Sequence, residues 1–245
     1  MELSKRLKAV AELLSQHSCV ADIGCDHGFL SIYLIQNKKC AHCLAMDVNE
    51  GPLERAREHI CDRQLSTYIE TRQSDGGKAI RLLSTPEGTR KPEADAAVLA
   101  GMGGRLMIRI LEESLEKFAA MEEWILQPQS EIARVRAYIR SIGRQIVQED
   151  MVLEDGKFYP IMKVCKAVGS EPLSDGTDPL FDRYGELLLR SRHPVLRLFL
   201  EREEQVYGEI LEELGRQTTG KAGKRREEIE EIMEGIQRGL DWFKG

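Results

Sequence analysis

The sequence predicts an α/β fold: a doubly wound, seven-stranded sheet with an antiparallel last strand, followed by a C-terminal helical hairpin or coiled coil. Short apolar runs alternate with helical patterns as far as Lys166, which is typical of a parallel sheet covered by helices. The last two runs are joined by Glu-Asp-Gly-Lys, a hairpin signal that predicts an antiparallel pair. Farther on, apolar residues recur only at helical spacing.

The elements follow in chain order. Leu3, Leu7, Val10 and Leu14 have helical spacing and predict an N-terminal helix. We expect strands at Val20–Ile23, His42–Asp47, Tyr68–Arg72, Ala96–Ala100, Trp124–Gln127, Gln145–Leu153 and Tyr159–Lys166. We expect helices at Phe29–Gln36, Pro52–Arg63, Gly77–Leu83, Gly104–Lys117 and Ile132–Ile142. Thr85–Glu93 contains two prolines and a glycine and is expected to be a surface loop.

Composition divides the chain into residues 1–168, a linker at 169–179 that is rich in Gly, Pro and Ser, and a helical arm at 180–245. The arm has two apolar stripes separated by a polar turn, which predicts two antiparallel helices. The first stripe is Val195, Leu198, Phe199, Val206, Ile210, Leu211 and Leu214, and the second is Ile229, Ile232, Met233, Ile236, Leu240 and Phe243. Such an arm could serve dimerisation or substrate binding, so either a monomer or a weak homodimer is expected.

Composition also narrows the class of protein. With 42% hydrophobic and 31% charged residues and no long apolar run, we expect a globular protein without a membrane span. The charged N-terminal helix does not resemble a signal peptide, which favours a cytoplasmic location. The six cysteines show no disulfide framework. Cys40 and Cys43 form a lone C-x-x-C, and since tetrahedral zinc sites need a second pair, we expect no metal.

The net charge and the local clusters of basic residues point in opposite directions on nucleic-acid binding. The net charge of −6 argues mildly against a phosphate-binding surface. Between Arg183 and Arg202, however, five arginines face two glutamates, and Lys5 and Arg6 make the N-terminus basic. Solvated helix surface is the ordinary interpretation of such patches. As the alternative, we consider RNA contacts from Lys5, Arg6, Arg190, Arg192 and Arg197.

The first strand leads through Gly24-Cys25-Asp26-His27-Gly28 into a helix, at the sheet edge where doubly wound folds bind ligands. Gly24 permits a tight turn, and Asp22 could accept hydrogen bonds from a cationic amine. A dinucleotide site would have a glycine where Asp26 stands, because pyrophosphate binds bare backbone at a helix start. The carboxylate of Asp26 therefore disfavours a nicotinamide-dependent oxidoreductase.

Two further acidic residues follow the next two strands. Asp47 could accept both hydroxyls of a ribose, and Asp75 the exocyclic amine of an adenine. Taken singly, each aspartate is more often a cap or turn former. Carboxylates at three successive strand ends, however, match an amino acid, a ribose and an adenine in turn. The ordered set predicts S-adenosylmethionine as cofactor.

The fourth and fifth strands end in segments suited to holding a base. Ala100-Gly101-Met102-Gly103-Gly104 allows close backbone approach to a flat ring, and Met102 adds an apolar contact. Gln127 and Gln129 carry amides that could read donor and acceptor edges of a base. Either segment alone could be a turn.

Together, the segments Leu3–Leu7, Ala21–Gly28, Ala100–Gly104 and Gln127–Gln129, followed by a helical arm, resemble the bacterial tRNA adenine-22 N1-methyltransferase family over nearly the whole chain. The resemblance implies a class I methyltransferase fold of Rossmann-like type, S-adenosylmethionine as methyl donor and N1 of an adenine in the D-loop region of tRNA as acceptor. Residues 1–168 would then be the catalytic domain, and the arm would help to hold tRNA. Gln129 departs from the family, which usually has Asn there.

Carried over by motif, the cofactor would be lined by Asp22, Gly24, Cys25, Asp47, Asp75, Gly76 and Gly101. Asp26, His27 and Met102 would face the target base. Because adenine N1 carries a free lone pair, attack on the methyl group needs alignment rather than prior proton removal. Asp26 could accept from the exocyclic amine and stabilise the positive charge that develops on the ring. The alternatives are methylation of another RNA base, and a non-enzymatic RNA-binding or assembly protein that uses the coiled coil.

Overall fold

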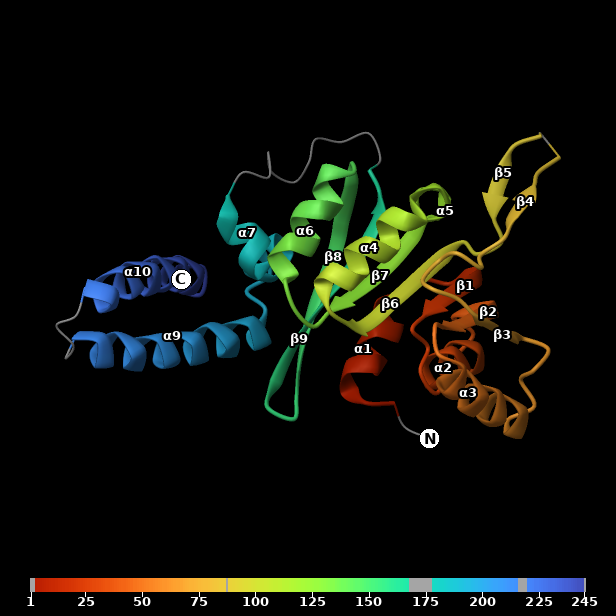
Figure 1. Cartoon of the computed structure of the whole chain (residues 1–245), viewed down its shortest axis with the longest axis horizontal. Helices are drawn as coiled ribbons and strands as arrows, with labels where there is room; N and C mark the ends of the chain where they lie inside the picture. The colour runs from red at the N-terminus through yellow and green to blue at the C-terminus, as the bar shows by residue number, and fades with distance from the viewer. Residues whose placement is uncertain (1–2, 87, 168–177, 216–219, 245) are drawn as a thin grey trace. The chain divides into compact units, whose positions relative to one another are not determined.

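The structure, a computed structural model, describes residues 3–86, 88–167, 178–215 and 220–244. The chain divides into two compact units, Met1–Asp175 and Gly176–Gly245 (Figure 1). The predicted linker at 169–179 lies almost entirely outside the described residues, so the domain boundaries stay a prediction. No described helix has both the length and the apolar character that a bilayer crossing requires.

A seven-stranded sheet forms the centre of the first unit, in the order β3-β2-β1-β6-β7-β9-β8. The first five strands in that order pair in parallel, and β9 is antiparallel to both β7 and β8. The strands are β1 (His17–Ile23), β2 (Cys40–Asp47), β3 (Ile69–Gln73), β6 (Ala96–Met102), β7 (Glu123–Pro128), β8 (Arg144–Glu154) and β9 (Lys157–Lys166). The predicted fold class is therefore confirmed, and the order reverses between β1 and β6, where such sheets bind ligands.

Helices cover both faces of this sheet because successive strand residues point to opposite sides. Val20 packs in one core with α1 (Lys5–Leu13), α2 (Phe29–Gln36) and α3 (Glu50–Asp62). Its neighbour Ala21 packs in a second core with α4 (Gly104–Glu113), α5 (Leu115–Ala120) and α6 (Ile132–Ser141). Burial on both faces explains why β1, β6 and β7 read as apolar runs rather than as alternating patterns.

The helix predicted at Gly77–Leu83 is wrong. This stretch ends in β4 (Leu82–Ser84), which pairs antiparallel with β5 (Arg90–Pro92) from the predicted loop. The carboxylate of Glu93 accepts a hydrogen bond from the backbone N–H of Arg81 and pairs with Arg72, so a residue from beyond the segment holds the backbone just before β4. A second difference is the break of the predicted helix Gly104–Lys117 into α4 and α5 at Ser114.

The second unit contains α7 (Pro179–Tyr184), α8 (Glu186–Arg190), α9 (Pro194–Gly215) and α10 (Gly220–Asp241). Gly239 lies against Leu200, and the Gln237 amide donates to Glu204, so residue numbers rise on one helix as they fall on the other. Helices α9 and α10 are therefore antiparallel, as predicted, and 22 residues make each about 33 Å long. The predicted first stripe is wrong in part, because Leu198 and Val206 are 48% and 42% exposed.

Candidate active site

The turn between β1 and α2 is held by its backbone. The N–H groups of Gly24 and Cys25 both donate to the carbonyl of Met46 at the end of β2, at 2.8 and 2.9 Å. Gly24 has a φ of +78° and Gly28 one of +72°, a region that favours glycine. A Cβ on Gly28 would lie 3.0 Å from the Cβ of Ala56 in α3, so the turn and this helix approach closely.

Asp47 contacts the backbone of Asp26 at this turn. Asp26 has a left-handed backbone (φ 50°), and its side chain is 71% exposed. Oδ2 of Asp47 lies 3.4 Å from the backbone N of Asp26, and its Oδ1 accepts from the N–H of Asn49 at 2.9 Å. A carboxylate has about four acceptor positions, so Asp47 keeps capacity for hydroxyl groups of a ligand.

Asp22 is not open at the strand end as the sequence suggested. It is 3% exposed, and its Oδ2 accepts a hydrogen bond from the hydroxyl of Ser31 in α2 at 2.6 Å. Burial raises the pKa of Asp22 to about 6, although the hydrogen bonds from Ser31 oppose the rise. Burial likewise raises the pKa of the neighbouring Cys25 thiol, which is also buried. These two predicted cofactor ligands therefore lie inside the protein.

His27 lies beside side chains of α3 and is partly exposed. Arg55 Nε donates to His27 Nδ1 at 3.2 Å, while His27 Nε2 lies 3.5 Å from Asp26 Oδ1. The imidazole stacks on Phe29, which in turn stacks on His59, with centroid distances of 5.5 and 4.7 Å. The ring therefore has a defined orientation beside Asp26.

The ends of β6 and β7 meet at Gly101, which has a φ of +80° at a register shift in the sheet. The Gln127 Oε1 accepts from the N–H of Gly101 at 3.0 Å and from Arg6 Nη1 at 2.9 Å, and the Gln127 Nε2 donates to the Pro128 carbonyl. Gln127 is fully buried. Its predicted contact with RNA is therefore corrected, because its amide is used within the protein.

Three predicted residues lie around this junction. The methyl carbon of Met102 would be 3.3 Å from a Cβ on Gly24, so Met102 joins the ends of β6 and β1. Arg6 also lies over the ring of Tyr159, 5.4 Å from its centroid, which makes it part of the packing as well as a basic group. Gln129 is exposed, and its backbone N–H donates to the Met102 carbonyl.

Asp75 and Gly76 follow β3. Lys78 pairs with Asp75 Oδ2 at 2.6 Å and lowers the pKa of this carboxyl, and Arg109 lies 3.3 Å from its Oδ1. An adenine amine would therefore have to share Asp75 with these cations. Gly76 has a φ of +64°, and a Cβ there would lie 2.9 Å from Ile110, so α4 packing already requires a glycine.

The other predicted RNA-binding residues are surface cations. Lys5 is exposed at the start of α1. In the second unit, Arg190 pairs with Glu186 and Arg197 with Glu201, at 2.8 and 2.7 Å. Arg192 follows α8 with a left-handed φ of 50°.

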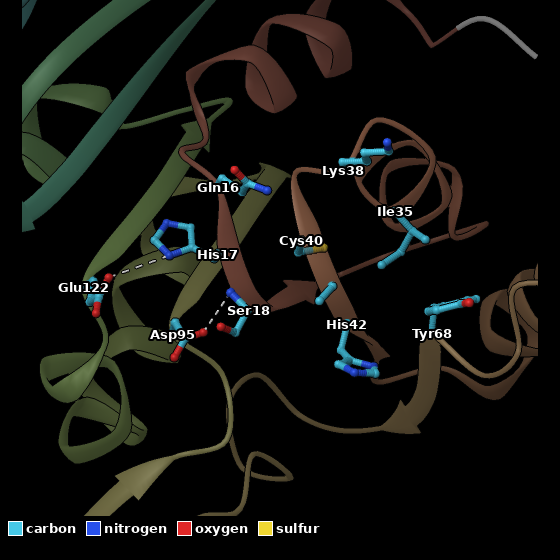
Figure 2. Close-up of a pocket in the computed structure, with 11 residues that line it drawn as sticks. Gln16, His17, Ser18, Ile35, Lys38, Cys40, His42, Tyr68, Asp95 and Glu122 are labelled. Atoms are coloured by element: carbon cyan, nitrogen blue, oxygen red, sulfur yellow. Dashed lines mark hydrogen bonds and ion pairs between the residues drawn. The ribbon is translucent and has the colours of Figure 1, made fainter.

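A hollow of about 810 Å³ lies at the opposite edge of the sheet, where the strands begin (Figure 2). The figure shows Ser18 on β1, His42 on β2 and Asp95 before β6 among its lining residues. The carboxylate of Asp95 accepts from the N–H groups of Ser18 and Cys19, so it caps the start of β1. This hollow contains none of the predicted site residues.

The cysteines do not suggest a metal centre. Within the described ranges, no three His, Cys, Asp or Glu side chains are placed to hold a metal ion. Cys40 and Cys43 are free thiols buried in the core. Cys61, near the end of α3, is exposed.

Sequence reasoning missed the partners that orient these side chains. Arg55 and His59 are four residues apart and so share one face of α3, which was a usable signal. Ser31 is a small polar residue between apolar neighbours in α2, a signal for a buried partner. No local pattern connects Lys78 and Arg109 jointly to Asp75.

The known proteins to which this chain is similar include several methyltransferases. The profile of a family described as methyltransferase domain matches residues 3–162. The chain is 30% identical to the tRNA (adenine(22)-N(1))-methyltransferase of Bacillus subtilis over 98% of both sequences. It is similar to the solved M1A22 tRNA methyltransferase of B. subtilis, with a TM-score of 0.80, 28% identity and coverage of 98% and 99%. It is equally similar to a Streptococcus pneumoniae protein, proposed to be a tRNA (m1A22) methyltransferase and solved with S-adenosyl-L-methionine, with a TM-score of 0.80, 31% identity and coverage of 98% and 100%.

Proposed function

Since the chain belongs to the tRNA (adenine(22)-N(1))-methyltransferase family, we propose that it transfers a methyl group from S-adenosylmethionine to N1 of adenine 22 of tRNA. The observation that carries this proposal is a pair of aspartates, Asp26 on the glycine turn that Met46 anchors and Asp47 at the end of β2 beside it. Carboxylates at this place suit a ligand with a cationic amine and sulfonium, and they oppose a diphosphate.

The residues fit the cofactor at several points. The exposed backbone of Gly24 and Gly101, both at positive φ, leaves room for close approach. Asp47 is proposed to accept hydrogen bonds from the ribose hydroxyls. Asp75 is proposed to accept one from the adenine amine while it also pairs with Lys78 and Arg109. The buried carboxylate of Asp22 acts from behind the turn, as a negative charge rather than as a direct ligand. When bound, S-adenosylmethionine supplies a methyl group made electrophilic by the sulfonium.

The target adenine is proposed to lie between Asp26 and Met102. The Asp26 carboxylate accepts a hydrogen bond from the exocyclic amine, which makes N1 more electron-rich and stabilises the positive charge that the product ring carries. Met102 contacts the flat face of the ring. Alignment of N1 with the methyl carbon is the main contribution of the protein, and no general base is needed because the N1 lone pair is free. The base must first leave its stack.

Lys5, Arg6 and Gln129 are proposed to contact tRNA near the site. Of these, Lys5 and Gln129 have exposed side chains. Arg190, Arg192 and Arg197 are proposed as a second contact. The glutamate partners of Arg190 and Arg197 reduce the net charge of this region, so we expect it to contribute less per residue than Lys5. We propose a monomer or a weak homodimer located in the cytoplasm.

The test is incubation with labelled S-adenosylmethionine and an unmodified tRNA transcript, followed by nucleoside analysis. We expect 1-methyladenosine, and we expect none on a transcript in which adenine 22 is replaced by guanine. Label at another base or position would refute the proposed target, while still showing methyltransferase activity. Absence of binding to S-adenosylhomocysteine in calorimetry would refute the cofactor itself.

A further inference from the structure

The contact between Arg55 and His27 determines which nitrogen of the imidazole carries a proton. Arg55 Nε lies 3.2 Å from His27 Nδ1. A guanidinium can only donate hydrogen bonds, so Nδ1 must present its lone pair. A neutral imidazole has a single N–H, and it is therefore on Nε2.

The protonated Nε2 faces Asp26, at 3.5 Å from Oδ1. A neutral N–H orients a carboxylate without cancelling its charge, whereas an imidazolium beside it would form an ion pair. The ring stacks on Phe29 with an interplanar angle of 13°, which restricts its tilt. His59 Nδ1, at 3.0 Å from the His27 carbonyl, holds the backbone of the same residue.

We propose that Arg55 is a positioning residue for methyl transfer: it keeps His27 in the neutral Nε2–H form, so that the Asp26 carboxylate stays oriented and fully charged toward the target adenine. This rests on the proposed function. The titratable or charged groups around the ring are Arg55 and His59 from α3 and Asp26 from the turn, with Asp47 of β2 next to the backbone of Asp26. Removal of the guanidinium frees Nδ1 to take a proton, and Asp26 then favours the imidazolium.

The first experiment is long-range ¹H–¹⁵N NMR of the full chain without cofactor, from pH 8.5 to pH 6. The His27 signal is identified by its loss in His27→Asn. We expect the neutral Nε2–H tautomer in the wild type over this range. In Arg55→Met we expect protonation of both nitrogens as the pH falls toward 6. A doubly protonated wild-type His27 at pH 7, or an Nδ1–H tautomer, would overturn the proposal.

The second experiment measures kcat for tRNA methylation over the same range. Relative to wild type, Arg55→Met should lose less than about 3-fold at pH 8.5 and about 10-fold or more at pH 6, because Nδ1 is then free to take a proton beside the Asp26 carboxylate. Arg55→Lys should restore part of the loss. Arg57→Met is the matched control, because Arg57 lies on the same helix and pairs with Glu50 and Thr71.

The two experiments separate the inference from the function on which it rests. Equal pH profiles for wild type, Arg55→Met and Arg57→Met would overturn the role of Arg55. If the wild type transfers no methyl group to tRNA at any pH, the proposed function fails, while the NMR result still decides the tautomer.

Discussion

Gln127→Leu tests whether the end of β7 holds the site together through a single amide. Leucine keeps the volume of this fully buried side chain but removes the acceptor shared by the Gly101 N–H and the Arg6 guanidinium. The variant also loses the donor to the Pro128 carbonyl, so two neutral hydrogen bonds and one to a charged group are removed, which costs roughly 2.5 to 6 kcal/mol in the free energy of unfolding. With a urea m value of about 2 kcal/mol/M, the midpoint should fall by about 1 to 3 M.

The assay is urea unfolding followed by the fluorescence of Trp124, in a Trp242→Phe background that removes the only other tryptophan. Calorimetry with S-adenosylhomocysteine should show weaker binding as well, because the turn at Gly101 loses its anchor. Gln127→Glu retains an acceptor oxygen beside Arg6 and should lose less stability. A leucine variant within about 0.5 kcal/mol of the wild type would show that these hydrogen bonds do not hold the junction.

Three further predictions concern charge. Asp26→Asn should lower kcat about 100-fold or more while the Kd for S-adenosylhomocysteine changes less than about 3-fold; a wild-type kcat would refute the role of the carboxylate. Burial raises the pKa of Asp22 from the ordinary 3.8 to about 6. Ionised Asp22 therefore destabilises the folded state above pH 6, and this destabilisation is absent below the unfolded pKa of 3.8, where the group is protonated in both states. Asp22→Asn should therefore raise the free energy of unfolding over wild type by roughly 3 kcal/mol at pH 7.5, and the gain should disappear near pH 4, as urea midpoints at both pH values will reveal. Changing Arg190, Arg192 and Arg197 together to Gln should weaken tRNA binding in filter assays and flatten its salt dependence, with cofactor binding unchanged; an unaltered tRNA Kd would exclude this region as a contact.

The central strands could be predicted from the sequence because they are buried on both faces, so runs such as Ala96–Ala100 stand out without any knowledge of their neighbours. The residues at the carboxyl ends could be predicted for a related reason, since parallel strands bring their ends to one edge. The helix predicted at Gly77–Leu83 failed because the backbone at Arg81 is held by Glu93 and its partner Arg72, which both lie outside the segment.

Side-chain direction and partners were beyond the sequence. Asp22 is one residue before the end of β1. Successive residues of a strand point to opposite sides of the sheet, and the side chain of Asp22 points inward to Ser31 rather than outward to a ligand. Gln127 was expected to hydrogen-bond a base, but in β7 its side chain is buried and its amide oxygen accepts from Gly101 and Arg6. Both errors arise from burial, which depends on elements that pack from elsewhere in the chain.

The exposed thiol of Cys61 is suited to selective chemical labelling. Thiolates are the reactive form of cysteine. Burial raises the pKa of the Cys19 thiol to about 12, and a hydrogen bond with Cys40, together with burial, raises the pKa of Cys43 well above its ordinary value. A maleimide dye should therefore label Cys61 first, without mutagenesis. Because α3 also carries Arg55 and His59, such a dye would sit on the helix that borders His27, and its emission could follow ligand binding in real time.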